Sequence, residues 1–464
     1  MSELKNQVEK DVQVNETESA SHSGSSAERH SHHHSHHHHH HSRHHSRHHS
    51  HRKSSSNRKT ADRRKSFRRF VRKNRKKLIF ISVALLFCIC SVVAGTFMDN
   101  IVHWGGETPI EGGTMITEGQ VRLSVSVFDR PVSIQNSAAD AVLSLDKDTS
   151  INDIYKKYKG SETRLDIGQP VVLSYNIMGA PQGYIVDQAV FFVSENENLA
   201  APIRFVPEKG ENSVECVNLK VSTAYFYRLD IRFTNGVKTS VLGNFTTADG
   251  VRMMTVDGAY NMRDVGGWKT TDGKRIKQGL LYRGCELDGA IESQYTLTET
   301  GKGTMLTQLN IKTDLDLRTQ TYANNNENVL GDNVQHMYYN MQMYTVQLQE
   351  AHAEKMRALF ADLADPSIYP AYLHCTYGQD RTGTVCYILG AMLGMSQEDL
   401  MADYNLSGLH HSLVANDDMD LFTRRLQEFP GSTLSEKVER YLLDIGVTPA
   451  QIQSIRSIFL EEVE

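Results

Sequence analysis

Cysteine is scarce in this chain, with six residues among 464. Two of them lie within one long apolar run. The other four are Cys216, Cys285, Cys375 and Cys386. Their spacing fits neither a disulfide framework nor a zinc site. Cysteine usage therefore excludes a disulfide scaffold and says little about the compartment.

Positive charge is scarce after residue 77. Residues 1–77 carry 19 Lys and Arg against 7 Asp and Glu, whereas the remainder carries 31 against 48, so +12 and −17 sum to the net −5. Sixteen of the 22 histidines also lie in the first 51 residues. This asymmetry predicts that the two ends of the chain face different surroundings.

A single uncharged run, LIFISVALLFCICSVVAGTFM, covers residues 78–98. Its 21 residues are enough to cross a hydrocarbon core of about 30 Å as a helix. The preceding FRRFVRKNRKK argues against a buried core helix, and the long leader argues against a cleaved signal peptide. Fourteen Lys and Arg lie in 52–77, so the positive-inside rule predicts a single-pass membrane anchor with a cytoplasmic N-terminus and an extracellular remainder.

The segments on either side of this run have little apolar periodicity. Residues 1–77 are typical of a disordered tail. Their stretch HSHHHSHHHHHHSRHHSRHHSH is either a metal-binding segment, since imidazole binds zinc, copper and nickel, or only a biased solvated sequence. Residues 99–119 contain five glycines and predict a linker.

Residues 120–248 contain short runs of alternating apolar and polar residues separated by turn-like stretches. This pattern predicts a small antiparallel β-sandwich. The part from Leu219 to Thr247 resembles the last strands of a fibronectin type III domain, with Leu219 leading into a tyrosine corner at Tyr225 and a closing Phe245-x-Thr247. The resemblance implies a spacer or contact module without catalytic residues.

From residue 250 to 464, apolar strands alternate with amphipathic helices. The runs LLYRG, IKTDLDLR and YPAYLHC predict strands, and VQLQEAHAEKMRALFADLA, TGTVCYILGAMLG and SEKVERYLLDIG predict helices. Such alternation predicts an α/β domain with a central sheet flanked by helices.

The residues that indicate chemistry are His-Cys-Thr-Tyr-Gly-Gln-Asp-Arg-Thr-Gly at 374–383, between a predicted strand and a predicted helix. Cys375 and Arg381 then bracket a turn at a helix N-terminus, where free N–H groups and the helix dipole favour an anion and a thiolate nucleophile. The fork of Arg381 can bind two phosphate oxygens, and Gly378 lets the loop curl. This chemistry requires no metal and no cofactor.

Residues 374–383 resemble the signature loop of the protein tyrosine phosphatase superfamily, in which His-Cys is followed by five residues and then Arg-Thr-Gly. The Asp-Arg-Thr-Gly ending resembles the bacterial tyrosine/lipid phosphatase branch of that superfamily. Other segments resemble that branch in the same order, over about 250–464. They are Asn-Met-Arg-Asp-Val-Gly-Gly at 261–267, Gly-Leu-Leu-Tyr-Arg at 279–283, Asp-Leu-Arg at 316–318, and Asp403-Tyr404 with Ser407.

The resemblance implies roles for individual residues. Cys375 attacks phosphorus and becomes phosphocysteine, and Arg381 binds the phosphoryl group. Thr382 hydrogen-bonds the sulfur, and His374 orients the loop. The general acid is Asp380, beside the arginine.

Other assignments stay open. Asp332, in the loop after the Asp-Leu-Arg strand, is the competing acid. The loop residues Thr376, Tyr377, Gly378 and Gln379 surround the substrate phosphate, and Arg263 either lines the site or locks a tight turn. Cys285 either forms a bridge to Cys375 or is an ordinary buried side chain.

Two uncharged residues bear on the substrate. Phosphoinositide-active relatives carry Lys where this chain has Gln379, and Thr376 is also uncharged. We therefore expect a phosphorylated protein of the phosphotyrosine type; a phosphoinositide, inositol phosphate or other envelope or host phosphoester is the alternative, and a non-catalytic surface binding protein is the alternative of another class. No nucleic-acid partner is predicted.

Overall fold

The computed structural model describes residues 114–116, 121–145, 149–160, 164–180, 182–319, 328–411 and 416–463. The predicted tail, with its histidine-rich segment, and the predicted membrane anchor lie outside these residues. Within the described ranges, no helix combines the length and the apolar character that crossing a bilayer requires. Nor do these ranges contain a cluster of three His, Cys, Asp or Glu side chains that could bind a metal.

Eight strands form two four-stranded antiparallel sheets, ordered β1-β2-β3-β6 and β5-β4-β7-β8. We call them the two-sheet domain. The strands are β1 Thr114–Ile116, β2 Arg122–Val125, β3 Val171–Met178, β4 Val186–Ser194, β5 Ile203–Phe205, β6 Ser213–Cys216, β7 Ala224–Phe233 and β8 Lys238–Thr246. The short strand β1 lies in the segment predicted as a linker, which the sequence pattern did not indicate.

Alternation along the strands places one face of each sheet in a shared apolar core. Leu173 in β3, Phe191 in β4 and Leu229 in β7 are fully buried in it. At one corner, the backbone N–H of Lys220 donates to the Tyr225 hydroxyl at 2.8 Å. A hydrogen bond between a tyrosine hydroxyl and the backbone a few residues upstream is typical of a tyrosine corner.

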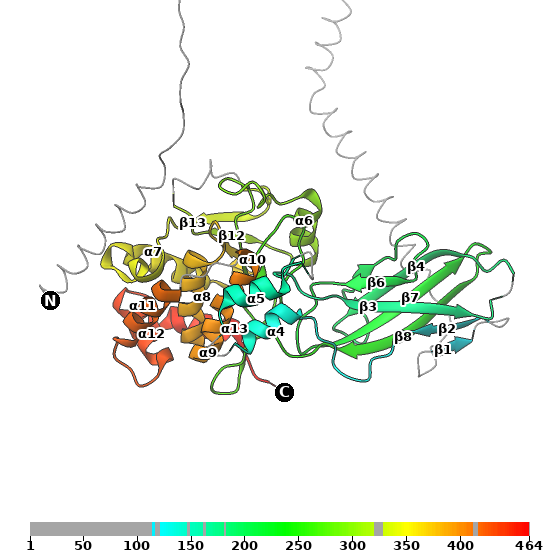
Figure 1. The fold of residues 1–464 in the computed structure, drawn as a ribbon, viewed down its shortest axis with the longest axis horizontal. Coiled ribbons are helices and arrows are strands. Elements are labelled where there is room, and N and C mark those ends of the chain that lie inside the picture. The colour runs from blue at the N-terminus through cyan, green and yellow to red at the C-terminus, as the bar shows by residue number, and fades with distance from the viewer. Residues whose placement is uncertain are drawn as a thin grey trace, which may run out of the picture. The chain divides into compact units, whose positions relative to one another are not determined.

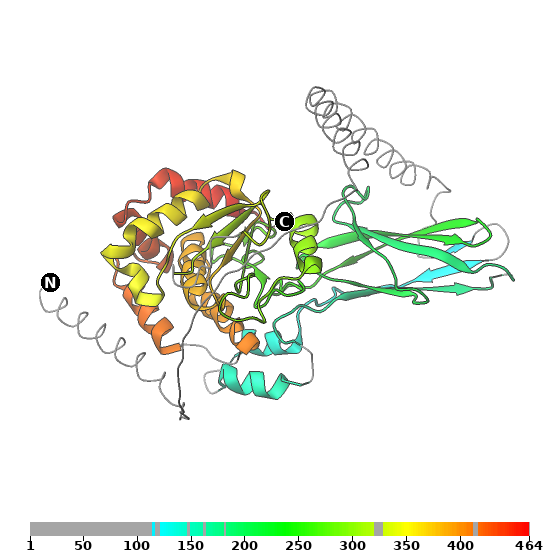
Figure 2. The same ribbon diagram turned by 90° about the horizontal axis from the view of Figure 1, so that it is seen from above.

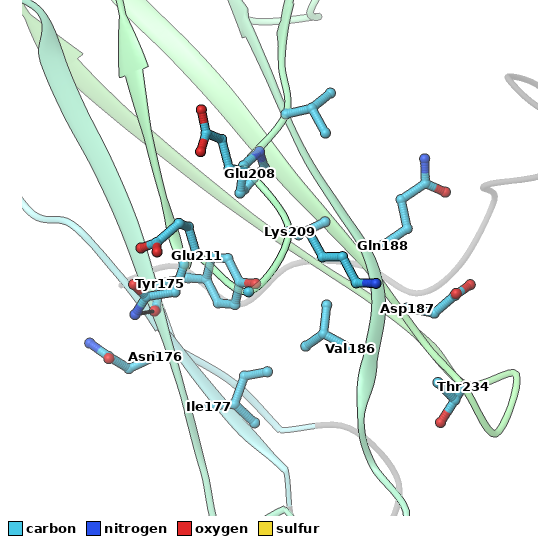
Figure 3. A pocket seen from close by; sticks show the side chains of 15 residues that line it. Tyr175, Asn176, Ile177, Val186, Asp187, Gln188, Glu208, Lys209, Glu211 and Thr234 are labelled. Carbon is cyan, nitrogen blue, oxygen red and sulfur yellow. Dashed lines mark hydrogen bonds between the residues drawn. The ribbon is translucent and has the colours of Figure 1, made fainter.

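A cavity of about 620 Å³ opens at one end of the two-sheet domain (Figure 3). Its apolar wall includes Ile177 and Val186, and its rim carries charged side chains such as Asp187, Lys209 and Glu211. All of its lining residues lie between 175 and 234. The cavity therefore contains none of the residues predicted for catalysis.

The strand pattern of residues 120–248 did not predict two helices that interrupt it. Between β2 and β3 the chain forms α4 (Ser137–Leu143) and α5 (Ile151–Tyr158). The N-cap side chains of Asn136 and Ser150 accept backbone N–H groups of the first turns, which favours helix initiation. The segment predicted as a small β-sandwich therefore also contains two helices.

We call α4, α5 and the following segment 164–168 the arm. Its apolar side chains, such as Ala139, Ile154 and Leu165, share a cluster with Leu406 and Leu409 near the C-terminal end of the chain. Figures 1 and 2 show these cyan helices beside the C-terminal helices, where α4 contacts α9 and α5 contacts α10. The arm therefore packs against the C-terminal domain, which is described next.

The C-terminal domain is built on a five-stranded sheet of order β13-β12-β14-β11-β9. All neighbours are parallel except β9, which is antiparallel to β11. The strands are β9 Arg263–Asp264, β11 Leu281–Gly284, β12 Thr313–Asp316, β13 Gln335–Tyr338 and β14 Ala371–His374, and a separate pair is formed by β10 Arg275–Ile276 and β15 Leu460–Glu461.

Helices cover this sheet, as the alternating pattern predicted. They are α6 Glu299–Gly303, η1 Thr304–Gln308, η2 Tyr344–Leu348, α7 Glu350–Leu363, η3 Pro366–Ile368, α8 Asp380–Leu393, α9 Gln397–Leu406, α10 Gly408–His411, α11 Asn416–Gln427, α12 Leu434–Asp444 and α13 Pro449–Phe459. Nearly every residue of α8 is buried. The central strand β14 leads through one loop into this central helix, so the loop lies at the carboxyl edge of the parallel strands.

Candidate active site

The loop between β14 and α8 contains the motif singled out in the sequence. Cys375 directly follows β14 and is 1% exposed, and Arg381 lies in the first turn of α8. Only Tyr377 and Asp380 are partly exposed among residues 374–382. The Cys375 thiol and the Arg381 guanidinium are therefore brought together at a helix N-terminus, as predicted.

Two carbonyl groups of the loop are bound from outside. The Tyr377 carbonyl accepts Asn261 Nδ2 at 3.0 Å and the Cys285 thiol at 3.2 Å. The Gly378 carbonyl accepts Arg283 Nη2 at 2.8 Å. A trans peptide points its C=O and the following N–H in opposite directions, so these bonds turn the next N–H groups inward.

The same applies one residue earlier. The Thr376 carbonyl accepts the backbone N–H of Glu286 at 3.0 Å. Three successive N–H groups, at 377–379, therefore face the interior of the loop, and no acceptor among the described residues takes them. Converging N–H groups form an anion-binding nest.

Gly378 is required by backbone geometry. Its φ is +64°, and a Cβ there would overlap the carbonyl of Gly284 in β11. A side chain at this position would push the loop off the sheet edge. The expectation that Gly378 lets the loop curl is met.

Arg381 adds two unsatisfied side-chain donors to the site. Its Nη2 donates to Thr376 Oγ1 at 3.2 Å. Its Nε and Nη1 are buried without a hydrogen-bond partner among the described residues. Because a buried guanidinium with free N–H groups is costly, this arrangement suits an anion that accepts both bonds.

Arg263 does not share that arrangement. It is 2% exposed and donates to Asp403 Oδ1 at 2.7 Å and to Asn261 Oδ1 at 2.7 Å. The structure therefore places Arg263 beneath the loop with its donors engaged. Of the two readings left open, a structural lock fits this geometry and direct substrate contact does not.

Asp403 in α9 joins two buried arginines. Its second oxygen accepts Arg283 Nη1 at 2.5 Å, and Arg283 in turn binds the Gly378 carbonyl. Burial alone would raise the pKa of Asp403, but Arg263 and Arg283 outweigh it and hold that pKa below its usual value. The ionised carboxylate therefore fixes an arginine that supports the loop.

His374 lies beneath Cys375 and is 2% exposed. Its Nε2 is 3.1 Å from Asp314 Oδ1. Burial lowers the pKa of His374, but the carboxylates of Asp314 and Asp316 outweigh burial and raise it to about 9. A charged imidazolium under the loop adds positive charge beneath the site that would bind an anion.

Asp380 is the better-placed acid candidate. It begins α8, is partly exposed, and its Oδ1 accepts a hydrogen bond from the Tyr344 hydroxyl. That hydroxyl is also 2.9 Å from the Tyr404 hydroxyl. Sequence reasoning missed Tyr344, since nothing near it in the sequence links it to a residue 36 positions away.

Asp332 lies in a turn before β13 and is exposed. Gln335 at the start of β13 and Ala371 at the start of β14 both pair with Thr313, so Asp332 is at the amino edge of the sheet. Three residues of strand, about 10 Å, separate that level from His374. This position argues against Asp332 as the general acid.

Two predicted residues have side chains without partners. The Thr382 hydroxyl and the Gln379 Oε1 are buried and make no hydrogen bond to any described residue. No bond from Thr382 to sulfur is formed in this arrangement, so its role stays a prediction. Cys285 and Cys375 are both free thiols, and burial raises the pKa of Cys285 well above its ordinary value.

Arg318, which follows strand β12, is held by three carboxylates. Arg318 binds Asp316 at 2.8 Å, Asp288 at 2.7 Å and Glu286 at 3.1 Å. Three carboxylates therefore neutralise the charge of Arg318. Through Glu286, whose N–H binds the Thr376 carbonyl, Arg318 supports the catalytic loop. In the sequence, Arg318 is identifiable only as the last residue of the Asp-Leu-Arg motif, which predicts no role for it.

Comparisons with known proteins address the same region. Residues 254–461 match the family model described as the tyrosine phosphatase family. One similar solved structure is the core catalytic domain of the PP-IP phosphatase SIW14 from S. cerevisiae in complex with citrate, at 16% identity and a TM-score of 0.25, covering 32% of this chain and 84% of that one. Among curated proteins, none matches the chain.

The matched region contains the whole constellation described above. It spans the nucleophile, the guanidinium and the carboxyl group beside it, all at the carboxyl edge of the sheet. The chain is therefore an enzyme, a cysteine-dependent phosphatase that hydrolyses phosphomonoesters through a phosphocysteine intermediate.

Proposed function

We propose that the phosphatase acts on phosphotyrosine-like monoesters. The Cys375 thiolate attacks phosphorus, the phosphorus–oxygen ester bond breaks, and Asp380 transfers its proton to the leaving oxygen. Water then attacks the phosphocysteine and returns its proton to Asp380, which releases phosphate and the thiolate. Arg381 and the inward N–H groups bind the equatorial oxygens throughout.

The charge around the loop carries this proposal. Arg381 is the only Lys or Arg in residues 374–382. Acidic side chains lie on its exposed side: the charge of Asp380 contributes to raising the pKa of Asp418, after the effect of burial. A second or third phosphate on a substrate ring needs cationic partners, so this setting favours a substrate with one phosphate.

Aromatic side chains lie at the exposed side of the loop. Tyr377 is partly exposed and meets the His411 ring edge-on at a centroid distance of 5.4 Å. Its hydroxyl donates to Glu292 at 2.8 Å, which fixes the ring. A fixed aromatic rim suits the phenyl ring of a phosphotyrosine.

The test is a substrate panel with the full-length chain and Cys375→Ser as the blank. Phosphotyrosine peptides, phosphoserine peptides, phosphoinositides and inositol phosphates are compared by kcat/KM. We expect phosphotyrosine peptides to lead. A preference for inositol phosphates or phosphoinositides would reject the substrate and leave the phosphatase chemistry intact.

We also propose that residues 78–98 anchor the enzyme in the cell membrane with the catalytic domain outside. The basic flank before this run and the acidic residues after it support this topology. Protease added to intact cells, with any wall removed, should release a fragment that starts near residue 100 and should spare the tail. Cleavage of the catalytic domain only after lysis would invert the topology.

We further propose that the two-sheet domain is a fibronectin type III-like spacer. The tyrosine corner at Tyr225 and the stacking of Tyr225 on Phe245 at 5.4 Å support this. If the domain is only a spacer apart from the arm, exchange of β4 to β8 surface side chains should leave kcat unchanged. A loss of activity on such exchange would contradict the spacer role.

A further inference from the structure

The arm ends beside the catalytic loop. After α5 the chain runs through Arg164, Leu165 and Asp166, and the Asp166 side chain is almost fully buried. Asp166 precedes the region that matches the tyrosine phosphatase family by 88 positions, since that region starts at residue 254. A carboxylate that is buried to this extent requires charged or hydrogen-bonding partners. The partners of Asp166 therefore show what this segment contacts.

Asp166 binds the segment that precedes β9. Its Oδ2 accepts the backbone N–H of Asn261 at 2.7 Å and lies 3.6 Å from His410 Nδ1. Arg164 binds both carboxylate oxygens, at 3.0 and 2.8 Å. The arginine also donates to the Ala259 carbonyl at 2.8 Å. Together, Arg164 and Asp166 therefore bind the Ala259 carbonyl and the Asn261 N–H and fix the backbone of residues 259–261.

Asn261 connects this grip to the catalytic loop. Its φ of +50° is a left-handed conformation that asparagine adopts at some cost, so its backbone needs an outside partner. Its side chain, turned by that conformation, donates from Nδ2 to the Tyr377 carbonyl at 3.0 Å. That carbonyl is one of the three whose outward direction aims an N–H group at the phosphate site.

We infer that Asp166 is a positioning residue for phosphate binding, supplied by the arm. It fixes the backbone of Asn261, Asn261 fixes the Tyr377 carbonyl, and the N–H of Gly378 is thereby aimed at the oxyanion. The inference extends the phosphatase activity and is independent of which monoester is the substrate. The phosphatase domain is therefore completed by the arm of its neighbouring domain.

The experiment compares full-length variants by the inhibition constant of inorganic phosphate and by kcat on an activated aryl phosphate. Asp166→Ala should weaken phosphate inhibition and lower kcat, each by about tenfold, because misplaced groups lose transition-state contacts steeply. Asp166→Leu keeps the volume and lacks the acceptor, and it serves if the alanine variant does not fold. Wild-type phosphate inhibition in a folded variant of either kind would overturn the inference.

Two controls separate positioning from loosening of the arm. Ile154→Ala removes a buried contact of α5 in the same cluster and should lower the melting temperature without changing phosphate inhibition. Asp166→Asn retains an oxygen for the Asn261 N–H and should keep most of the phosphate affinity. Equal weakening by Ile154→Ala would show that general loosening is the cause, and the inference would fall.

A double-mutant cycle tests the route. If Asp166 acts through Asn261, the loss of phosphate affinity in Asp166→Ala with Asn261→Ala should be close to that of Asn261→Ala alone. Strictly multiplicative losses in the double variant would place the effect of Asp166 elsewhere and reject this route.

Discussion

The two domains bury their strands in different surroundings. The core of the two-sheet domain consists of aliphatic and aromatic side chains such as Leu173, Phe191 and Leu229. Beneath the catalytic loop the buried side chains include Arg263, Arg283 and Asp403 instead. An apolar core stabilises without directing particular backbone atoms, whereas buried charges bind carbonyl groups in defined directions. Burying charged side chains costs more free energy than burying apolar ones. The chain accepts this cost beneath the catalytic loop, where the direction of backbone groups matters.

The largest effect is expected in the loop. Cys375→Ser should reduce turnover below about one part in 10⁴ and keep the fold and phosphate binding, since only the nucleophile is lost. Arg381→Ala should lose both turnover and phosphate binding, because its two free donors have no substitute. Steady-state kinetics and phosphate inhibition measure both. Full activity in Cys375→Ser, or inactivation by a chelator, would contradict the cysteine mechanism.

The second-largest effect is expected at Asp403, which binds the buried Arg263 and Arg283. Asp403→Asn leaves two buried arginines without their counter-charge and should lower the free energy of unfolding by about 3–5 kcal/mol. It should also weaken phosphate inhibition, because Arg283 binds the Gly378 carbonyl. Denaturant unfolding and phosphate inhibition give the two numbers.

Leu229→Ala in β7 is the matched control from the apolar core. It should cost a similar stability, about 2–5 kcal/mol, with phosphate inhibition unchanged. If both variants changed phosphate inhibition equally, the contrast between the two cores would have no functional meaning.

A third effect concerns the acid. Asp380→Asn should slow the hydrolysis of alkyl or tyrosyl phosphates by about 100-fold and that of activated aryl phosphates far less, since good leaving groups need no proton. Asp332→Asn serves as the control and should behave as wild type. The assignment would be wrong if Asp332→Asn showed the selective loss and Asp380→Asn did not.

The pKa of His374 predicts a pH dependence of stability. Because the folded pKa of about 9 lies above the ordinary 6.5, the stabilisation is complete below about pH 6.5 and is lost as the pH rises through 9. The free energy of unfolding should therefore fall between pH 6.5 and 9. Asp314→Asn removes the nearest carboxylate and should flatten this slope; an unchanged slope would remove His374 as the cause.

The smallest effect is expected in the two-sheet domain. Tyr225→Phe removes the hydroxyl that accepts the Lys220 N–H and should cost about 1 kcal/mol of stability. Its kcat should equal that of wild type. A change in kcat here would mean that the apolar core also specifies the geometry of the loop.

Features that are contiguous in the sequence could be predicted. The loop from Cys375 to Arg381 is one such feature, and the period of two in β3 and β7 is another. The helices of the arm were missed, because they are only seven and eight residues long and their apolar faces are buried by another domain. Short helices of that kind are stabilised by packing more than by propensity.

The support of the loop could not be predicted for a related reason. Arg263 meets Asp403 across 140 positions, and Asp166 meets Asn261 across 95. Nothing in the sequence near Arg263 distinguishes a guanidinium that binds substrate from one that binds a carboxylate. Only the fold shows which donors are already engaged.

One pair of glycines has a consequence for variation. A Cβ at Gly378 would overlap the Gly284 carbonyl, and a Cβ at Gly284 would overlap the Tyr372 hydroxyl, so the catalytic loop, β11 and the β14 side chain meet without room for a methyl group. Neither glycine can be exchanged alone without displacing the group that its Cβ would overlap. In a scan of every single substitution, these two positions should be as intolerant as the nucleophile itself, although they contribute no functional group. At this edge of the sheet, the close packing requires that a side chain be absent.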